Sequence, residues 1–409
     1  IPDASSFLWE RSWPDLGYVS NLPSAGQLSA EANGGNAATA NKWVVLSNSG
    51  HYTATGKSGL YVLDALTGEQ IAFIPTTSGV PTGRGLGGVS VVRDRARRIV
   101  AAYAGDAVGN LWRFNLGTTF SATKIFTTEN SRPIYGAPAW QLARGGKYSG
   151  SFTLNGAGGT STTATQCSSD KRDGKCGTIV VFGTGMMLDE DDRANSATQA
   201  IYGVWDPTPI NAQQVSTVFP IGTALLEQTM VSTGTKVAND TGIDYFYSVS
   251  RNAIDYNAAH NGWKLQLGSL ANATGERVIA DAANLGSAVA IYSTIIKPAS
   301  ASDEELCTKG NAAPNLIYIL NGRDGAGTYG FRTSKLDAHM NYSVGYLESG
   351  GFSRGIAYQD SGSGGKREVS IETVGKTTEK ILDDDATLKD CTKTTSDALG
   401  ANSGPAYLL

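Results

Sequence analysis

The sequence predicts an all-β protein, a modified seven-bladed β-propeller with loop insertions. The main observation is a unit that occurs twice within residues 59–116: a glycine, a strand-sized apolar and aromatic run, and a polar turn. Residues 59–64 (GLYVLD) begin the first copy, and residues 109–115 (GNLWRFN) repeat the pattern about 50 residues on. Such runs are typical of hairpin strands, and a repeat of this length is typical of one four-stranded blade.

Composition supports the same fold class. The chain has 50 glycines among 409 residues and only 17% charged residues, which is typical of a β protein with many turns. No amphipathic pattern extends beyond a few helical turns, so we expect little helix. A chain of this length exceeds the size at which one simple core keeps growing, and we expect one repeat-built propeller over residues 1–409.

Further strands are expected in order along the chain. Residues 42–48 (KWVVLSN) have the apolar character of a buried strand. Residues 133–140 (PIYGAPAW) contain prolines, which place them at a sheet edge or a blade junction. The sheets are expected to continue through residues 178–183, 201–206, 241–251, 262–267, 277–280, 288–296 and 315–321.

The large aromatic residues of these strands are interpreted as core. An inner strand directs one face toward the neighbouring blade, and aromatic side chains fill the wedge between blades. We therefore expect burial, not a ligand cage, for a set of five: Tyr61, Trp112, Trp205, Trp263 and Tyr318.

Two regions are expected to lie outside the blades. Residues 145–177 are rich in Gly, Ser and Thr with few large apolar side chains, which predicts a projecting loop insertion that buries little. Residues 361–409 begin with SGSGGK and continue with a polar stretch, which predicts a peripheral hairpin and tail.

The four cysteines predict two disulfides. Cys167 and Cys176 bracket a polar loop, and Cys391 is expected to tie the tail back to Cys307. Metal ligation is the alternative, but the spacing of the close pair is not that of a zinc knuckle, and no histidine lies near either pair in sequence. Each bridge is expected to contribute on the order of 2 to 5 kcal/mol to stability.

Charge and hydropathy limit the partners and the location. The net charge is −4 with no run rich in Lys and Arg, which argues against nucleic acid. No run approaches the ~18 apolar residues that a membrane span needs. Because the chain opens directly on folded-looking sequence, we expect a fragment of a longer, exported protein.

One block resembles a known family. Residues 103–106 (YAGD) followed by residues 109–114 (GNLWRF) are similar to a segment of the C-terminal propeller of the PilC/PilY type IV pilus biogenesis and adhesin proteins. The resemblance extends from the first residues to about Pro298. Its specific positions are Tyr103, Gly105, Asp106, Gly109, Asn110, Trp112, Arg113 and Phe114, and flanking segments agree at residues 8–18, 60–68, 181–185, 199–206 and 275–277.

The resemblance implies a non-enzymatic module of a pilus biogenesis factor and tip adhesin. Such a module supports pilus assembly against retraction, twitching motility and surface attachment. The implied partners are type IV pilins or minor pilins and a host or abiotic surface, and the implied location is the cell surface, at the pilus tip or associated with the outer membrane. Surface contact is expected on the insertion at 145–177 and the tail, although a solvated spacer remains an equal alternative.

Two charged residues of this block have a structural interpretation. Asp106 lies where a strand enters a turn, so its carboxylate is expected to accept backbone N–H bonds there. Arg113 lies between Trp112 and Phe114 and points to the opposite face. A pairing of Asp106 with Arg113 is conceivable.

Two other function classes remain open. Residues 63–68 (LDALTG) are similar to the repeat of quinoprotein dehydrogenases, which are also propellers, but no docking Trp follows Gly68 and no two cysteines are adjacent. No nucleophile elbow or phosphate loop is evident either. The third class is a propeller that binds carbohydrate or protein without any link to pili.

Calcium binding is not expected. Many members of the family carry a short loop before the YAGD block, with Asp or Asn at four positions that suit a hard cation. The corresponding residues here are Val92, Asp94, Ala96 and Val100, and arginines surround the one carboxylate. We hypothesise that an arginine of residues 92–100 supplies the positive charge instead, toward Asp94 or Asp106.

A second acidic run is interpreted as a solvated turn. It comprises Asp189, Glu190, Asp191 and Asp192 and is the other place where a cation is conceivable. It lacks the alternating spacing and the glycine of a cation loop.

Overall fold

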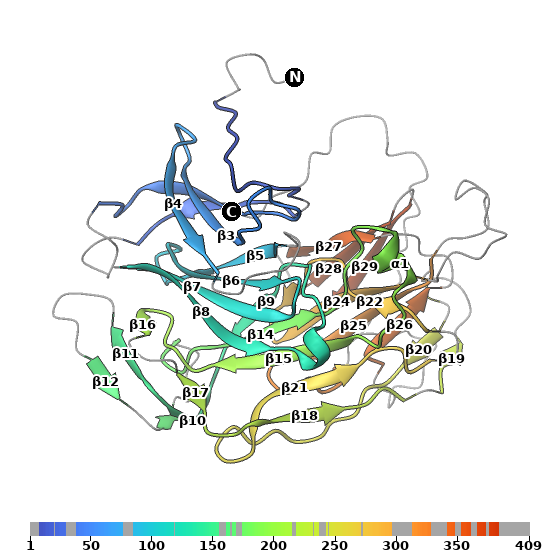
Figure 1. The fold of residues 1–409 in the computed structure, drawn as a ribbon. Coiled ribbons are helices and arrows are strands. Elements are labelled where there is room, and N and C mark those ends of the chain that lie inside the picture. Colours follow the sequence, from blue (N-terminus) through green and yellow to red (C-terminus); the bar gives the residue numbers. More distant parts are fainter. Residues whose placement is uncertain are drawn as a thin grey trace.

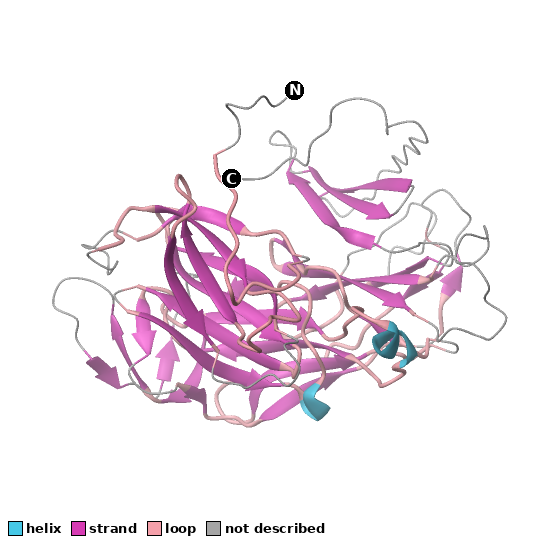
Figure 2. Cartoon of the chain, turned by 45° about the horizontal axis from the view of Figure 1, so that its top comes forward, coloured by secondary structure: helices cyan, strands magenta, loops and turns pink. Residues whose placement is uncertain are grey.

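The regular secondary structure of the described residues is almost wholly β-strand (Figures 1 and 2). The computed structural model describes residues 8–19, 21–29, 38–76, 85–117, 119–154, 161–163, 166–168, 174–214, 218–231, 233–236, 243, 245–270, 273–296, 313–328, 342–347, 353–360, 366–373 and 376–383. In these ranges, no helix has the length and apolarity needed to cross a bilayer. The expected all-β fold is confirmed.

The two repeat units of the sequence form two consecutive four-stranded antiparallel sheets. GLYVLD is β3 and NLWRFNL is β7, the third strand of each sheet, so the predicted repeat is confirmed. The first sheet contains β1 (Ser24–Gln27), β2 (Trp43–Asn48), β3 (Gly59–Asp64) and β4 (Gln70–Pro75). The second contains β5 (Leu86–Arg93), β6 (Ile99–Asp106), β7 (Asn110–Leu116) and β8 (Phe120–Thr127).

The third sheet has five strands, in the order β9-β14-β15-β21-β18. Strand β9 follows Pro138 and lies at the sheet edge, as its prolines predicted. Strand β18 runs parallel to β21 at the other edge. The strands are β9 (Ala139–Leu142), β14 (Thr178–Gly183), β15 (Ala200–Asp206), β18 (Ala224–Gln228) and β21 (His260–Gln266).

A fourth, seven-stranded sheet and a three-stranded meander follow. The strands of the larger sheet are β19 (Thr235–Lys236), β20 (Tyr245–Tyr247), β22 (Glu276–Arg277), β23 (Ala283–Leu285), β24 (Ala288–Ile295), β25 (Asn315–Asn321) and β26 (Val344–Leu347). The meander contains β27 (Ser353–Asp360), β28 (Lys366–Thr373) and β29 (Lys376–Asp383). The C-terminal hairpin is thus part of three strands that begin before residue 361. Because the sheets differ in strand number, the count of seven blades stays a prediction.

Residues 145–177 were expected to bury little, but the parts of this range that the structure describes contain buried residues. They contain β10 (Gly145–Ser149), β11 (Ser151–Leu154), β12 (Ser161–Thr163) and β13 (Gln166–Ser168), which form two small sheets with β16 (Ala212–Gln214) and β17 (Phe219–Pro220). The side chains of Tyr148 and Phe152 are buried in the largest core cluster. Two well-placed aromatic residues are enough to anchor an otherwise polar segment.

The core lies between the sheets, and the five aromatic residues expected in it are all buried. Trp112 belongs to the cluster of the first two sheets, whereas Trp205, Trp263 and Tyr318 belong to the cluster of the third and fourth. Helix is scarce, as predicted: within the described residues, α1 (Glu190–Ala194) is the one α-helix and η4 (Glu129–Ser131) a single 3₁₀ turn.

Candidate functional site

Asp106 organises the turn that joins β6 to β7. Its Oδ1 accepts bonds from the backbone N–H groups of Val108 (3.0 Å) and Asn110 (2.9 Å). Its Oδ2 accepts from Asn110 Nδ2 (2.9 Å) and from Trp112 Nε1 (2.8 Å). Gly109 completes the turn at a φ of 80°, in the left-handed region that favours glycine. The expected turn-forming role of Asp106 is confirmed.

Arg113 forms a buried network on the opposite face of β7. Its Nη1 lies 3.1 Å from Asp206 Oδ2, at the end of β15, and donates to the hydroxyl of Tyr103 at 2.9 Å. The Tyr103 hydroxyl donates to the same Asp206 oxygen at 2.6 Å and lies 2.7 Å from Thr178 Oγ1. None of these four side chains is more than 1% exposed.

The conceivable pairing of Asp106 with Arg113 is replaced by the pair Arg113–Asp206. Strand alternation explains the difference, because Tyr103 lies opposite Arg113 and Ala104 lies opposite Trp112 in the register of β6 and β7. Asp106 is on the Trp112 side of the hairpin, as its bond to the indole shows. The hydroxyl and carboxylate that face Arg113 come from β6 and from the next sheet.

Within this network the guanidinium of Arg113 keeps its charge and the phenol of Tyr103 stays neutral. Burial acts to lower the pKa of Arg113, but the adjoining Tyr103 and Asp206 more than offset it and raise that pKa above its ordinary value. Burial, followed by the negative charge of Asp206, raises the pKa of Tyr103, so the phenol keeps its proton. The result is a fully bonded, water-excluded ion pair.

The β6–β7 hairpin therefore fastens three sheets together. Trp112 and Phe114 pack in the core shared with the first sheet, whereas Tyr103 packs in the core shared with β14 and β15. Gly105 allows close approach, since a Cβ there would lie 2.2 Å from Ile134 Cβ. The residues that carry the family resemblance thus act as a scaffold. Asp206 and Thr178 were not predicted to take part.

The side chain of a tryptophan, Trp9, packs against the LDALTG turn between β3 and β4. Trp9 Nε1 donates to Ala65 O at 3.0 Å, and a Cβ at Gly68 would lie 2.4 Å from Trp9 Cδ2. No Trp follows Gly68 in sequence, and the Trp that packs on this turn comes from the N-terminal segment, 56 residues from Ala65. The resemblance to the quinoprotein repeat is a resemblance of turn packing.

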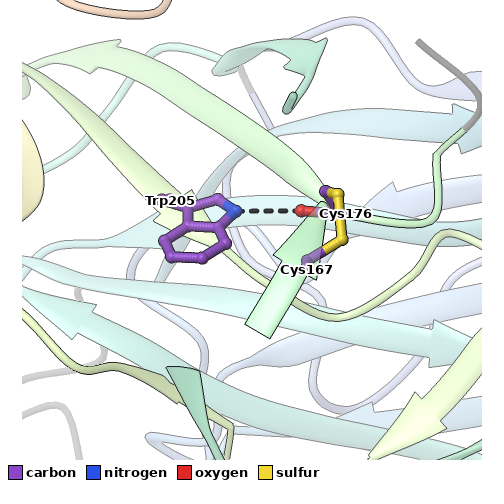
Figure 3. The surroundings of a disulfide bond; sticks show 3 residues. All are labelled: Cys167, Cys176 and Trp205. Carbon is purple, nitrogen blue, oxygen red and sulfur yellow. Dashed lines mark hydrogen bonds between the residues drawn. A yellow bond between two sulfur atoms is a disulfide. The ribbon is translucent and has the colours of Figure 1, made fainter. Parts of the chain in front are cut away.

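The disulfide between Cys167 and Cys176 is confirmed, with a Cα–Cα distance of 5.5 Å. Figure 3 shows the indole of Trp205 beside it, donating to Cys176 O at 2.9 Å. The ring of Tyr148 packs edge-on against the same indole, with 6.3 Å between the ring centroids. The disulfide, the insertion and β15 thus meet at Trp205. Cys307 and Cys391 lie outside the described residues, and their pairing stays a prediction.

Residues 92–100 comprise the end of β5, a tight turn at residues 94–98 and the start of β6. Asp94 Oδ1 accepts from Arg98 N at 2.9 Å, and Arg97 takes a left-handed φ of 61°. The guanidinium of Arg93 donates to Ala25 O (2.7 Å) and Arg97 O (3.1 Å). We hypothesised an arginine directed at Asp94 or Asp106, but the guanidinium of Arg93 binds backbone carbonyl oxygens instead. Carbonyl oxygens are also ligands that a calcium ion would use.

The acidic run forms the first turn of α1, not a solvated turn throughout. Asp189 is the N-cap and accepts from Asp192 N at 2.9 Å, while Tyr52 donates to its other oxygen at 2.6 Å. Asp192 is buried and accepts from Leu188 N at 2.8 Å. Acidic side chains favour a helix N-terminus, which accounts for the run. Among the residues described here, no three His, Cys, Asp or Glu side chains cluster as a metal site would require.

Comparison with known proteins places this scaffold in a family. The family model of the PilY1 beta-propeller domain matches residues 9–241, more than half of the chain. The chain belongs to the PilY1 β-propeller family. The matched region contains the whole Tyr103–Arg113–Asp206 network.

Curated relatives and a solved structure agree. The chain is 28% identical over 340 residues to the type IV pilus biogenesis factor PilY1 of Pseudomonas aeruginosa, covering 80% of this chain and 27% of that protein. A PilY1 homolog of Xylella fastidiosa is 26% identical over 370 residues, covering 86% of this chain and 22% of the homolog. The chain thus spans about a quarter of the length of these relatives.

The crystal structure of the Pseudomonas aeruginosa PilY1 C-terminal domain has the same fold. It matches with a TM-score of 0.64 at 21% identity, over 89% of this chain and 73% of that one. The propeller expectation is thereby confirmed for this PilY1-family chain.

Calcium is predicted not to bind at residues 92–100, because Asp94 is the one carboxylate there and already accepts from Arg98 N and Ser29 Oγ. Calcium should be titrated calorimetrically into chelator-treated wild type and into the Asp94→Ala variant. The two should give the same heat of binding. Asp191→Ala is the matched variant in the acidic run at residues 189–192. Heat lost with Asp94→Ala would contradict the prediction, whereas heat lost only with Asp191→Ala would relocate the site.

Glu276, in another segment of family resemblance, is predicted to make stability depend on pH. Its carboxyl is buried and accepts from Ser293 Oγ (2.6 Å), Tyr318 OH (2.7 Å) and Gly268 N (2.7 Å). Burial raises its pKa, and these three bonds only partly oppose the shift. The folded protein therefore holds this proton to higher pH than the unfolded chain, and the free energy of unfolding falls as pH rises from the ordinary carboxyl pKa through the raised one.

Urea denaturation across about pH 4 to 8 tests this dependence. In Glu276→Gln, the free energy of unfolding should fall less steeply with rising pH than it does in the wild type. The control is Glu69→Gln, at an exposed carboxylate far from this buried cluster in sequence. Identical pH profiles for the wild type and Glu276→Gln would refute the prediction.

Proposed function

We propose that this chain is the propeller module of a type IV pilus biogenesis factor. The observation that carries the proposal is the family match over residues 9–241, together with relatives named as type IV pilus biogenesis factors. As a module of a longer protein, the chain would support pilus assembly and twitching motility and contribute to surface attachment. Its partners would be pilins or minor pilins, and a host or abiotic surface.

The proposed role is structural and binding, without catalysis. It is supported by the use of the charged family residues, since Asp106, Arg113 and Asp206 are all buried and bonded within the scaffold. The proposed location is exported, at the cell surface, on the pilus tip or associated with the outer membrane. The Cys167–Cys176 disulfide supports an oxidising compartment.

Attachment is proposed for the insertion at residues 145–177 and for the C-terminal tail. The insertion suits this role because Tyr148 of β10 holds it against Trp205, and strands β11 and β12 lie at the periphery of the fold (Figure 1). Loops on a rigid support commonly carry recognition.

In-frame deletion of the propeller from the parent gene tests the pilus role. We expect loss of surface pili and of twitching. A second deletion, in a strain that cannot retract its pili, separates assembly from retraction: pili that return there identify the module as a factor opposing retraction. Normal piliation and twitching in the first strain would refute the proposal.

Removing residues 150–166 alone tests attachment. We expect reduced adhesion with pili retained. Unchanged adhesion would refute the role of the insertion and leave the pilus role standing. Glycan binding in a strain without any pilus defect would instead favour a propeller unrelated to pili.

A further inference from the structure

A pocket of about 340 Å³ lies where the third sheet meets the fourth. Its walls come from the end of β9 and the residues after it, from Ser287 between β23 and β24, and from the turn after β25. Gly145, the first residue of the insertion, borders it. The volume is at the lower end of the range for small-molecule sites, roughly 300 to 1,000 Å³.

The pocket is rich in hydrogen-bond donors that the fold leaves unused. Arg144 and Arg323 are both exposed, and neither guanidinium forms an ion pair within the described part of the chain. Asn321 Oδ1 accepts from Arg323 N at 2.9 Å, so the amide NH₂ of Asn321 is left as a further donor. The charged residues of the lining are Arg144, Arg323 and Asp324, so their net charge is +1.

The turn that carries Arg323 is held rigidly. Tyr256, whose pKa burial raises so that it remains a phenol, donates to Arg323 O at 2.6 Å. Gln228 Nε2 donates to Asp324 O at 2.8 Å, and Asp324 Oδ1 accepts from Ala326 N at 3.0 Å. A site whose backbone is fixed before binding loses less entropy when a ligand arrives.

We propose that this pocket binds an acidic sugar unit, with its carboxylate held by Arg144 and Arg323. Guanidinium groups match carboxylates in charge and in hydrogen-bond geometry. Sugar hydroxyls both donate and accept, which suits Asp324 as acceptor beside Asn321 and Ser287 as donors. A peptide carboxyl terminus suits the pocket less well, because polar residues outnumber the apolar Leu142, Ala143 and Ile179 in its lining.

The inference deepens the attachment part of the proposed function and rests on it for biological meaning only. Binding is measured on the purified chain, so its failure would leave the piliation and twitching experiments unaffected.

Calorimetric or NMR titration with glucuronate tests the proposal, with glucose as the neutral sugar and N-acetylalanine as the peptide-like carboxylate. Glucuronate should bind best. Arg144→Ala and Arg323→Ala should each weaken its binding roughly tenfold to hundredfold, the loss expected for one charge-assisted contact. Arg95→Ala, at an exposed arginine of the β5–β6 turn, is the matched control and should bind as the wild type does.

Because Arg144 and Arg323 are exposed, their substitution should leave the unfolding transition unchanged, which circular dichroism can verify. Equal binding of glucose and glucuronate would overturn the proposal, as would no binding of glucuronate. Tighter binding of N-acetylalanine would overturn the sugar assignment in favour of a peptide carboxylate. Loss of binding in the Arg95 variant alone would place the site elsewhere.

Discussion

Replacing Asp206 by alanine should lower the free energy of unfolding by about 3–5 kcal/mol, the cost of leaving a buried charge without its partner. Arg113 is fully buried, and its Nη1 lies 3.1 Å from the carboxylate that would be removed. Tyr103 would also lose the acceptor of its 2.6 Å bond. Chemical denaturation of the purified chain measures the loss.

A surface ion pair supplies the matched control. Lys57 lies 3.4 Å from Asp15, but its side chain is 62% exposed. Lys57→Ala should therefore cost no more than about 1 kcal/mol, because exposed pairs are screened by water. Arg113→Met in the Asp206→Ala background should recover part of the loss, since no unpaired charge remains. Equal costs for Asp206→Ala and Lys57→Ala would contradict the role assigned to the network.

Trp205→Ala should cost about 3–5 kcal/mol and loosen the insertion at residues 145–177. The indole is buried, contacts Tyr148 and Tyr256 edge-on, and binds the carbonyl of Cys176. Removing it would leave a cavity between β15 and β10 together with an unpaired carbonyl. Denaturation measures the stability, and limited proteolysis within the insertion measures its anchoring.

Two comparisons separate packing from hydrogen bonding. Trp205→Phe keeps most of the ring contact and should cost about 1 kcal/mol for the lost bond, plus the smaller packing change. Trp43, in β2, is 56% exposed, and Trp43→Ala should change stability by roughly 0.5 kcal/mol or less. Unchanged proteolysis of the insertion in Trp205→Ala would contradict the anchoring role assigned to Trp205.

Strand positions were predictable from sequence, whereas the joining of the sheets was not. The runs at residues 178–183 and 315–321 coincide with β14 and β25 because alternating apolar and aromatic residues bounded by turn residues are a local signal. The alternation also placed Arg113 on the face opposite Trp112. It carried no information on which strand of another sheet would lie there.

The insertion illustrates a second limit. Its Gly, Ser and Thr content predicted a polar loop, but Tyr148 packs against Phe152 and against Trp205, which lies more than 50 residues later in the chain. Average composition understates burial when two side chains supply most of the apolar contact. The spacing of Cys167 and Cys176, by contrast, predicted a bridge that is present.

By itself, the sequence determined the all-β class, the repeat that becomes β3 and β7, the buried aromatic residues and the turn built by Asp106, because each depends on residues close together in the chain. The tertiary structure alone decided that Arg113 pairs with Asp206, 93 residues away, and that Trp9 packs on the turn at Ala65 and Gly68. It also brought Arg144 and Arg323 to one pocket. Side-chain alternation fixes the direction in which a residue points, but the packing of one sheet on another fixes what it meets.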